Sequence, residues 1–441
     1  MKKDQNKKFV GLISVGVPWF DVTTAKKNLD ETRAWLQNSW QVCGPQDLVV
    51  DSEQLEVALE NFQSQNRPDV IIIQIGTFPD GEVPLTIAER LGVPVIIHSL
   101  PEPDINKQIS LNSLCGANLS TFTLNEMDIP HKAIHGSVSS ASVQIEMSAY
   151  IRAALTLATM KRTRLGLIGF RAPGFYPCVF DELLIRRTFG VGIDHIPLSE
   201  VVLSLQSGTA RKAPTTDFPR IEGGNLPKES IESIERYYGG LSKVLEKSGK
   251  NLFAIKDWPE IMGLEDPGGI WPGLGWLLDE GYLMAPEGDV NAAITMGVLR
   301  GLDSGTPFFA DISAWDDETS ALALWHYGGA PSLASDPGEI RYGEEGREVQ
   351  FTLKPGRATL VRFGYHKGQF RILAIGIEVL KKKVSLRRAG GWVKTVNQPA
   401  QQVVRAMLDN GWEHHVVLTY GDVVPELQAI SRFTGIPIVV M

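Results

Sequence analysis

Apolar and polar residues alternate along the first part of the chain in the manner of a parallel α/β fold. The short run Phe9–Val17 is apolar, and Val70–Ile75 is apolar enough to be buried on both faces, as strands of parallel sheets are. A helix that Asp51 can cap lies between them, and another strand is expected at 93–99. These segments predict β–α–β units with right-handed crossovers.

A second α/β pattern follows. Arg164–Phe170 is predicted to be a strand, and helices at about 229–248 and 269–280 bracket another strand at Leu252–Ile255. The loop Arg171–Pro177 would lie at the carboxyl end of its strand, and ligands of open parallel sheets bind at that edge. We therefore expect this loop to face a ligand.

The pattern of apolar and polar residues changes near residue 347. From there, short apolar runs are joined by turns that contain glycine, which is typical of antiparallel sheet. A strand at His415–Tyr420, a helix near 425–433 and a strand at 436–440 close the chain. The predicted fold class is α/β, with two Rossmann-like, doubly wound domains and a mixed α/β C-terminal domain that contains an antiparallel β region. The predicted domains are residues 1–162, 163–312 and 313–441.

Composition narrows the functional classes. The 441 residues include 43 basic and 51 acidic side chains, for a formal charge of −8, which argues against a nucleic-acid or anionic membrane surface. No apolar run reaches the roughly 18 residues of a membrane span. The three cysteines are widely spaced and form no C-x-x-C pair, so we expect no disulfide framework and a location in the reducing cytoplasm.

Four potential metal ligands lie at the ends of predicted elements. Glu287 precedes a helix at 290–302, Asp311 and His326 each end a strand, and His415 opens the last long strand. Carboxylates with imidazoles suit Mn²⁺, Fe²⁺ or Co²⁺ better than a structural zinc site. The alternatives are ordinary, because an acid at a helix start is often only a cap and a histidine at a strand end is often scaffolding.

Other side chains have two interpretations each. Arg171 can bind a substrate hydroxyl or an anionic substituent through its guanidinium, or form a surface ion pair. Trp19, Trp315 and Trp412 can stack on a sugar ring or fill the core. No base accompanies Cys178, so a nucleophilic role is not expected. Gly169–Gly174 lacks the G-x-G-x-x-G spacing, and this disfavours a Rossmann oxidoreductase.

Several segments, in order along the chain, resemble motifs of the L-fucose/L-arabinose isomerase superfamily. Glu280–Met296 is similar to its acidic motif, and His414–Asp422 to its terminal histidine motif, with His415 in the ligand register. Further segments that resemble motifs of this family, including those of its shorter fucose-isomerase-like branch, are Ser99–Pro103, Asn112–Asn118, Phe308–Ser313 and His326–Pro331.

The resemblance implies two Rossmann-like domains, a C-terminal domain and aldose–ketose isomerisation through an enediol. It makes Glu287 and Asp311 both metal ligands and the acid–base pair, with His415 as third ligand, while His326 matches a ligand of the arabinose isomerase branch. The implied metal is Mn²⁺, or the related ions Co²⁺, Fe²⁺ or Mg²⁺. The side chains expected to contact the sugar are Arg171, Phe175, Trp19, Trp315, His414 and Trp412.

The chain departs from the family pattern near the expected substrate. Many relatives have Cys-Trp-Pro where this chain has Lys256-Asp-Trp-Pro259, and the loops 16–21 and 171–177 are not those of a standard fucose or arabinose isomerase. A pentose, a 6-deoxyhexose and a hexose with an anionic 6-substituent remain open as substrates. The resemblance also implies a symmetric homo-oligomer, often a hexamer. The alternative function is a non-catalytic sugar-binding protein on the same scaffold.

Overall fold

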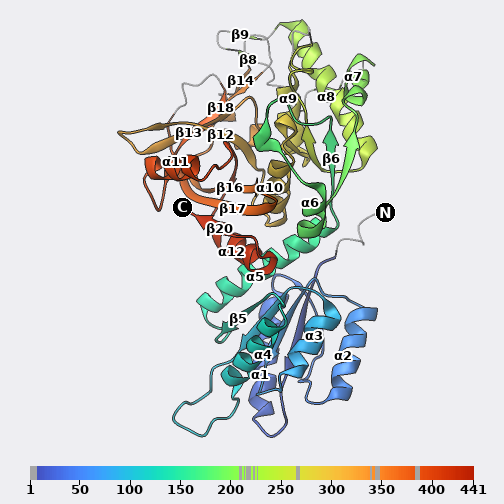
Figure 1. Ribbon diagram of the computed structural model, residues 1–441, viewed down its shortest axis with the longest axis vertical. Helices are drawn as coiled ribbons and strands as arrows, with labels where there is room; N and C mark the ends of the chain where they lie inside the picture. The colour runs from blue at the N-terminus through green and yellow to red at the C-terminus, as the bar shows by residue number, and fades with distance from the viewer. Residues whose placement is uncertain are drawn as a thin grey trace. The chain divides into compact units, whose positions relative to one another are not determined.

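The computed structural model describes residues 7–207, 211–212, 214, 220–221, 224–225, 227–264, 269–337, 340–342, 348–382 and 388–441. The chain forms two compact units (Figure 1). Unit 1 comprises residues 1–158 and 425–435, and unit 2 comprises residues 159–424 and 436–441.

Unit 1 is built on a five-stranded parallel sheet of order β2-β1-β3-β4-β5. Its strands are β1 (Phe9–Val15), β2 (Gln41–Cys43), β3 (Val70–Ile75), β4 (Val95–Ser99) and β5 (His131–His135). Its helices are α1 (Val22–Gln37), α2 (Ser52–Ser64), α3 (Glu82–Leu91), α4 (Ser113–Glu126) and α5 (Ala141–Lys161). All six residues of β3 are buried, which is why its sequence reads as an unbroken apolar run.

The helix α12 (Val424–Thr434) returns from the end of the chain to pack on α5. The guanidinium of Arg152 donates to the carboxylate of Glu426, with Nε 2.9 Å from Oε1. The rings of Tyr150 and Phe433 meet edge to face with centroids 5.6 Å apart. The last α/β segment therefore contributes its helix to the first unit.

Unit 2 contains a four-stranded parallel sheet of order β11-β10-β6-β7. Its strands are β6 (Arg164–Ile168), β7 (Gly192–Ile196), β10 (Leu252–Ile255) and β11 (Leu283–Ala285). The helices of this part are α6 (Glu182–Phe189), α7 (Leu198–Gln206), α8 (Lys228–Ser248), α9 (Ile270–Asp279) and α10 (Val290–Gly301). Three short 3₁₀ turns are described, η1 (Tyr176–Cys178), η2 (Pro286–Gly288) and η3 (Pro331–Leu333). Two small antiparallel strand pairs are formed by β8 (Arg220–Ile221) with β9 (Gly224–Asn225), and by β14 (Arg341–Tyr342) with β15 (Val349–Gln350).

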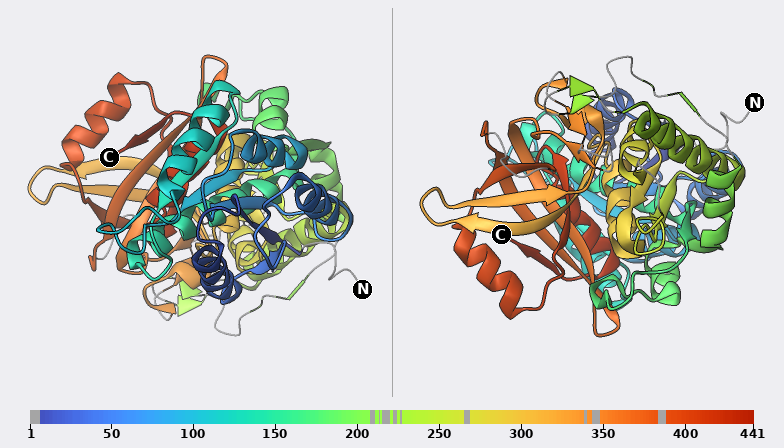
Figure 2. Two further views of the ribbon diagram at one scale, coloured as in Figure 1. Left: turned by 90° about the horizontal axis from the view of Figure 1, so that it is seen from below. Right: turned by 90° about the horizontal axis from the view of Figure 1, so that it is seen from above.

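The second sheet of unit 2 closes on itself. Its order is β16-β19-β12-β13-β18-β17-β20, and β17 also pairs with β16 along their whole length, which makes an antiparallel barrel. Its strands are β12 (Phe308–Asp316), β13 (Ala321–His326), β16 (Gly356–His366), β17 (Gln369–Val379), β18 (Ala389–Thr395), β19 (His415–Tyr420) and β20 (Ile438–Val440). The outer ends of β12 and β13 project as a two-stranded ribbon (Figure 2), and α11 (Ala400–Asp409) precedes β19.

These sheets confirm the predicted fold class, with parallel α/β sheets followed by an antiparallel β region. The predicted domain boundaries fall just after α5, at residue 162, and inside β12, at residue 312. The division into domains 1–162, 163–312 and 313–441 stays a prediction. Among the described helices, none is both long and apolar enough to cross a bilayer.

Candidate functional site

Strand pairing brings two of the predicted ligands together. In the antiparallel pair of β12 and β19, Asp311 lies directly across from His415. Cross-strand partners have neighbouring side chains on the same face of a sheet. Nε2 of His415 is 3.6 Å from Oδ1 of Asp311. Two residues more than a hundred positions apart in sequence are thus fixed beside each other by register.

Glu287 reaches the same imidazole from the parallel sheet. It lies in η2, directly after β11, with φ 60° and ψ 15°, a left-handed conformation that residues with a side chain rarely adopt. Gly288 is left-handed as well, at φ 68°, and a Cβ there would lie 2.1 Å from the carbonyl oxygen of Phe170. The turn therefore requires glycine at 288. It places Oε2 of Glu287 2.9 Å from Nε2 of His415.

The three side chains suit a divalent cation. A cation bound about 2.1 Å from two adjacent ligands holds them about 3 Å apart, close to the separations from His415 to Glu287 and Asp311. Oε2 of Glu287 and Oδ1 of Asp311 are buried and have no hydrogen-bond partner. His414 also lies close, because one ligand atom from each of Glu287, His414 and His415 lies within 4.8 Å of the others. Buried carboxylate oxygens without donors are what a cation would satisfy.

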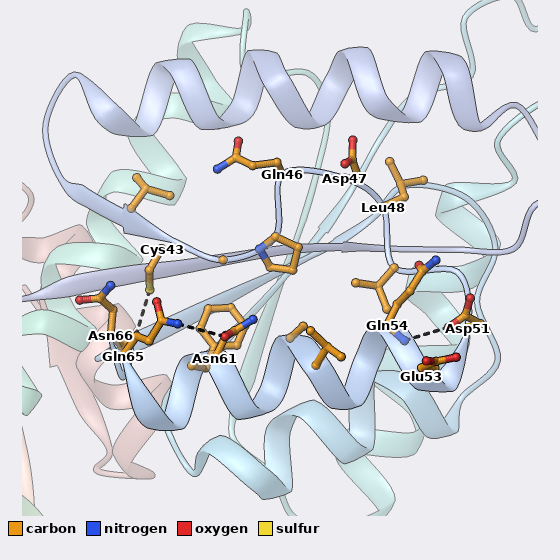
Figure 3. A pocket seen from close by; sticks show the side chains of 17 residues that line it. Cys43, Gln46, Asp47, Leu48, Asp51, Glu53, Gln54, Asn61, Gln65 and Asn66 are labelled. Atoms are coloured by element: carbon orange, nitrogen blue, oxygen red, sulfur yellow. Dashed lines mark hydrogen bonds between the residues drawn. The ribbon is translucent and has the colours of Figure 1, made fainter.

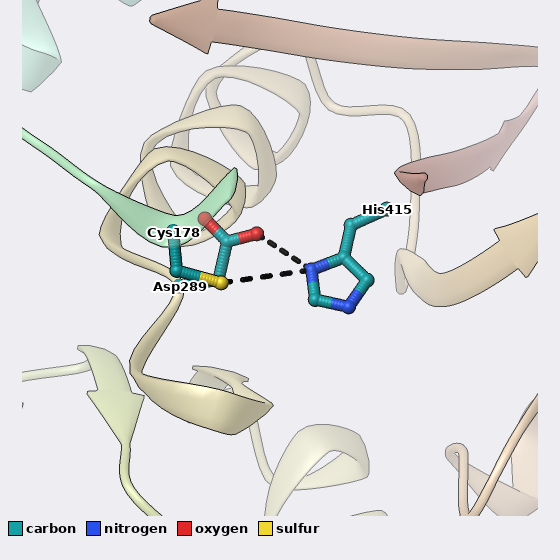
Figure 4. Close-up of side chains that lie close together, drawn as sticks. All are labelled: Cys178, Asp289 and His415. Atoms are coloured by element: carbon teal, nitrogen blue, oxygen red, sulfur yellow. Dashed lines mark hydrogen bonds and ion pairs between the residues drawn. The ribbon is translucent and has the colours of Figure 1, made fainter. Parts of the chain in front are cut away.

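Behind the imidazole, Asp289 fixes the orientation of His415 (Figure 4). Its Oδ2 lies 2.8 Å from Nδ1 of His415, and its Oδ1 accepts the N–H of Ala292 at 2.9 Å as the cap of α10. The fully buried guanidinium of Arg362 donates to the same carboxylate at 2.7 Å. Sγ of Cys178 lies 4.0 Å from Nδ1 of His415. Nδ1 is therefore occupied, and Nε2 faces the carboxylates of Glu287 and Asp311.

Asp257 accepts a hydrogen bond from the backbone of Glu287. It follows β10, is fully buried, and its Oδ1 accepts the backbone N–H of Glu287 at 2.6 Å. Burial, against the opposing effect of this hydrogen bond and together with the charge of Glu287, raises the pKa of Asp257 to about 8. Oδ2 of Asp257 is buried with no hydrogen-bond partner.

The charges of the cluster are strongly coupled. Burial raises the pKa of Asp311 to about 6, against the effect of His415. Burial alone would lower the pKa of His415, but the carboxylates of Asp289 and Glu287, together with Cys178, raise it well above its ordinary value. Burial raises the pKa of Asp289 too, but the Arg362 guanidinium and His415 outweigh it and hold that pKa below its usual range. The carboxylates around His415 thus favour positive charge at its Nε2. A divalent cation can supply that charge in place of a proton.

His326 lies on the other side of Phe309. The ring of Phe309 packs 4.7 Å from that of His326 and 4.5 Å from that of His415, measured between centroids. Burial holds the pKa of His326 well below its ordinary value. Among the residues that the structure describes, no hydrogen bond or ion pair joins His326 to Glu287 or Asp311. It therefore lies behind an aromatic ring rather than in the cluster, and its role as a ligand stays a prediction.

Three of the predicted substrate residues lie around the cluster. The ring of Phe175 is 6.0 Å from that of His414 and 6.4 Å from that of His415. Burial, followed by the charge of His415, lowers the pKa of His414 to about 4. The Cα of Arg171 lies 2.8 Å from where a Cβ on Gly288 would be, so its backbone packs against the turn that carries Glu287.

Among the described contacts, none joins Trp315, Trp412 or Trp19 to the cluster. Trp315 lies on the ribbon of β12 and β13, where its Nε1 donates to Asp317 at 2.9 Å. Trp412 stacks under the guanidinium of Arg371, 3.8 Å from the ring centroid. Trp19 lies in unit 1, in the loop after β1, and is 77% exposed. Their contact with a sugar stays a prediction.

Sequence reasoning missed the supporting residues. The sequence pattern marks Asp289 as no more than an acid at a helix start, which is often only a cap, and it links neither Arg362 nor Asp257 to the site. A signal was present for Arg362, because a charged residue inside the apolar run Leu360–Phe363 needs a buried partner. Asp257 directly follows a buried strand of the parallel sheet, the same kind of position that drew attention to Arg171.

A large surface cavity lies in unit 1, whereas the cluster belongs to unit 2. In unit 1, a hollow of about 860 Å³ opens between the loop 42–49 and α2 (Figure 3). Its labelled polar side chains are mainly amides, including Gln46, Gln54 and Asn61, and several bond to one another or to nearby backbone. None of the proposed metal ligands lines it.

Together, the fold and the site define an α/β enzyme whose carboxylate and imidazole cluster, at the edge of a parallel sheet and a barrel, is of a kind that binds a divalent cation. No protein-family model matches the chain. Curated relatives do match over nearly its full length.

The sulfoquinovose isomerase of Alkalicoccus urumqiensis is 28% identical over 436 residues, which cover 95% of this chain and 96% of that protein. The sulfoquinovose isomerase of Priestia aryabhattai is 25% identical over 440 residues, covering 96% and 97%. The L-arabinose isomerase of Clavibacter sepedonicus is 24% identical over 329 residues, covering 68% and 63%. These matches support the L-fucose/L-arabinose isomerase-like superfamily and indicate a sugar isomerase, as the motifs predicted.

Proposed function

We propose that this chain interconverts an aldose and a ketose at a divalent-cation site formed by Glu287, Asp311 and His415. The observation that carries the proposal is a pair of buried carboxylate oxygens that lie beside Nε2 of His415 and, apart from ion pairs with the neighbouring histidines, have no hydrogen-bond partner among the described residues. Oxygen and imidazole ligands favour Mn²⁺, with Co²⁺, Fe²⁺ or Mg²⁺ as alternatives.

The protein's own groups then account for the proton transfer. Isomerisation moves one proton between C1 and C2 through an enediol, so it needs a base near one carbon and an acid near an oxygen. Glu287 and Asp311 supply this pair, since both carboxylates lie beside Nε2 of His415. The cation, when bound, polarises the two neighbouring sugar oxygens. Asp289 holds the His415 ring in place, and the ring of Phe175 packs beside the two imidazoles.

The proposed substrate is a hexose with an anionic substituent at C6, of which sulfoquinovose is an example. Two sulfoquinovose isomerases match more than nine-tenths of the chain. Arg171 is the proposed partner of the anion, because it packs against the Glu287 turn and its Nε is buried with no hydrogen-bond partner. Its guanidinium lies over the rings of Phe170 and Tyr176, which keep it near the site.

We also propose a symmetric homo-oligomer in a reducing, cytoplasmic setting. Large apolar side chains that are exposed in the single chain are of the kind that subunit contacts cover, among them Ile105 at 83%, Leu183 at 80% and Tyr176 at 73%. The three cysteines are free, which suits reducing conditions.

The test is a panel of sugars offered to protein that has been stripped of metal and refilled with Mn²⁺. We expect aldose–ketose exchange with the 6-sulfonated hexose that disappears on metal removal and in Glu287→Gln. In Arg171→Met, kcat/KM for the sulfonated sugar should fall by roughly 10–100-fold, the loss expected for a charged hydrogen-bonded contact, while that for the 6-deoxy analogue changes little.

Other outcomes would redirect the proposal. Exchange of a pentose alone would make the chain an arabinose-type isomerase and remove the role of Arg171. Tight sugar binding that is indifferent to chelator, without exchange of any sugar, would instead indicate a non-catalytic sugar-binding protein.

A further inference from the structure

Asp257 and Glu287 are joined across two neighbouring strands of the parallel sheet. β10 and β11 are paired with Ala254 opposite Ala285, so Asp257 and Glu287 lie just beyond the carboxyl ends of adjacent strands. The carboxylate of Asp257 is fully buried, and its Oδ1 accepts the N–H of Glu287 at 2.6 Å. At 2.6 Å, the bond is short for an N–H donor and an oxygen acceptor.

Glu287, which donates this bond, has a strained backbone. Glu287 is left-handed, at φ 60°, and for residues with a Cβ this region is unfavourable. Such a conformation persists only where its surroundings hold it. Gly288 continues the left-handed turn against the backbone of Phe170 and Arg171, so the turn is supported on one side by that loop and on the other by Asp257.

The turn has a direct consequence for the site. It allows residues two positions apart to hold opposite nitrogens of one imidazole, with Glu287 at Nε2 (2.9 Å) and Asp289 at Nδ1 (2.8 Å) of His415. If Glu287 relaxed to an ordinary backbone conformation, its carboxylate would swing away from Nε2. The geometry of the proposed ligand set thus depends on the backbone of Glu287.

We infer that Asp257 is a positioning residue, whose carboxylate holds Glu287 in the left-handed conformation that aims its side chain at the cation site. The inference rests on the proposed function, because it takes Glu287 to be a ligand.

The experiment compares Asp257→Asn, which keeps an oxygen able to accept the Glu287 N–H, with Asp257→Leu, which has a similar shape and no acceptor. The matched control is Asp69→Leu in unit 1, because Asp69 is also buried and its Oδ2 accepts the backbone N–H of Phe9 at 3.1 Å. Full-length protein is titrated with Co²⁺, whose visible absorption reports the ligands directly, and kcat and KM are measured separately.

We expect Asp257→Leu to raise the Kd for Co²⁺ by roughly 10–100-fold, as is usual for loss of a group that orients a ligand, and to shift the Co²⁺ bands and lower kcat. Asp257→Asn and Asp69→Leu should stay close to the wild type in Kd and spectrum. If Asp257→Leu does not fold, Asp257→Val, which also lacks an acceptor, takes its place.

Two results would overturn the inference. One is a wild-type Kd and spectrum in the variant without an acceptor. The other is equal loss in Asp257→Asn, which would show that charge, and not the hydrogen bond, matters. A wild-type protein that binds no Co²⁺ would remove the metal site and this inference together. One that binds Co²⁺ but isomerises no sugar would fail the proposed isomerase activity, while the comparison of Asp257 variants by Co²⁺ affinity and spectrum would still decide this inference.

Discussion

At the scale of single residues, His415 is the centre of the site. Its two nitrogens have different surroundings, since Nδ1 meets Asp289 and Nε2 meets Glu287 and Asp311. A carboxylate on the far nitrogen of a ligating histidine fixes its tautomer and increases its basicity. Asp289 in turn shares its charge with Arg362, and both are completely buried. The ligand geometry therefore depends on a buried ion pair that contacts His415 at Nδ1, the nitrogen that does not face Glu287 and Asp311.

Replacing Asp289 by asparagine should affect both binding and folding. The variant Asp289→Asn leaves the buried Arg362 with only the more distant carboxylate of Glu413, at 3.9 Å, and breaking a buried pair costs up to about 3–5 kcal/mol. It also weakens the orientation of His415, so metal affinity should fall by roughly 10–100-fold. Urea unfolding of the metal-free protein measures the first effect and Co²⁺ titration the second.

The control for this prediction removes both charges. In Asp289→Asn with Arg362→Met, part of the lost unfolding free energy should return, because no isolated charge remains buried, while metal affinity should stay low. A single variant as stable as the wild type, with unchanged Kd for Co²⁺, would show that the Asp289 carboxylate has neither role.

At the scale of elements, a row of polar side chains ties together β3, β4 and α1 in unit 1. Nε2 of Gln74 donates to Oγ1 of Thr32 at 2.8 Å and lies 3.3 Å from Nδ1 of His98. Nε2 of His98 lies 2.8 Å from the carbonyl oxygen of Gly136. The contacts are consistent with a neutral ring that donates from Nε2 and accepts at Nδ1. All three side chains of the row are buried.

This row predicts an acid sensitivity of unit 1. Burial lowers the pKa of His98 from 6.5 to about 4, so the unfolded chain binds a proton in this range that the folded chain does not. Stability is therefore highest above the unfolded pKa and falls as the pH drops from 6.5 towards 4. The loss from this group should reach up to about 3 kcal/mol.

Hydrogen exchange at the amides of β3 and β4, followed across this pH range, measures the effect in unit 1 alone. The variant His98→Asn is the control, because it removes the titrating ring and should flatten the pH dependence, whatever its own stability. An equally steep loss of protection in His98→Asn would assign the acid sensitivity to another group.

At the scale of the whole molecule, sequence patterns predicted most of the fold. Buried parallel strands such as Val70–Ile75 matched the structure residue for residue, since a strand covered on both faces must be apolar throughout. The antiparallel region was predicted from its short runs and turns. Two features were missed: the closure of the barrel through β16 and β17, and the docking of α12 on α5. Both depend on contacts between distant segments, which local periodicity does not encode.

The candidate site was predicted to a similar depth. Glu287, Asp311 and His415 stood out because each lies where a regular element begins or ends, and the structure brings them together. The positions of Asp257 and Arg362 follow from pairing of strands and packing of helices that the sequence does not display. Such partners become visible only when the ligands they support have been located in space.

The central claim is that a pair of carboxylates transfers a proton between C1 and C2. The most direct test is to run the Mn²⁺-loaded enzyme in D₂O with a 6-sulfonated aldose and to follow C1 and C2 by NMR. A base that exchanges with solvent should introduce deuterium at C2 of the recovered aldose and at C1 of the ketose, and Glu287→Gln should abolish both. Isomerisation without any deuterium at either carbon would indicate direct hydride transfer and contradict the acid–base role of Glu287 and Asp311.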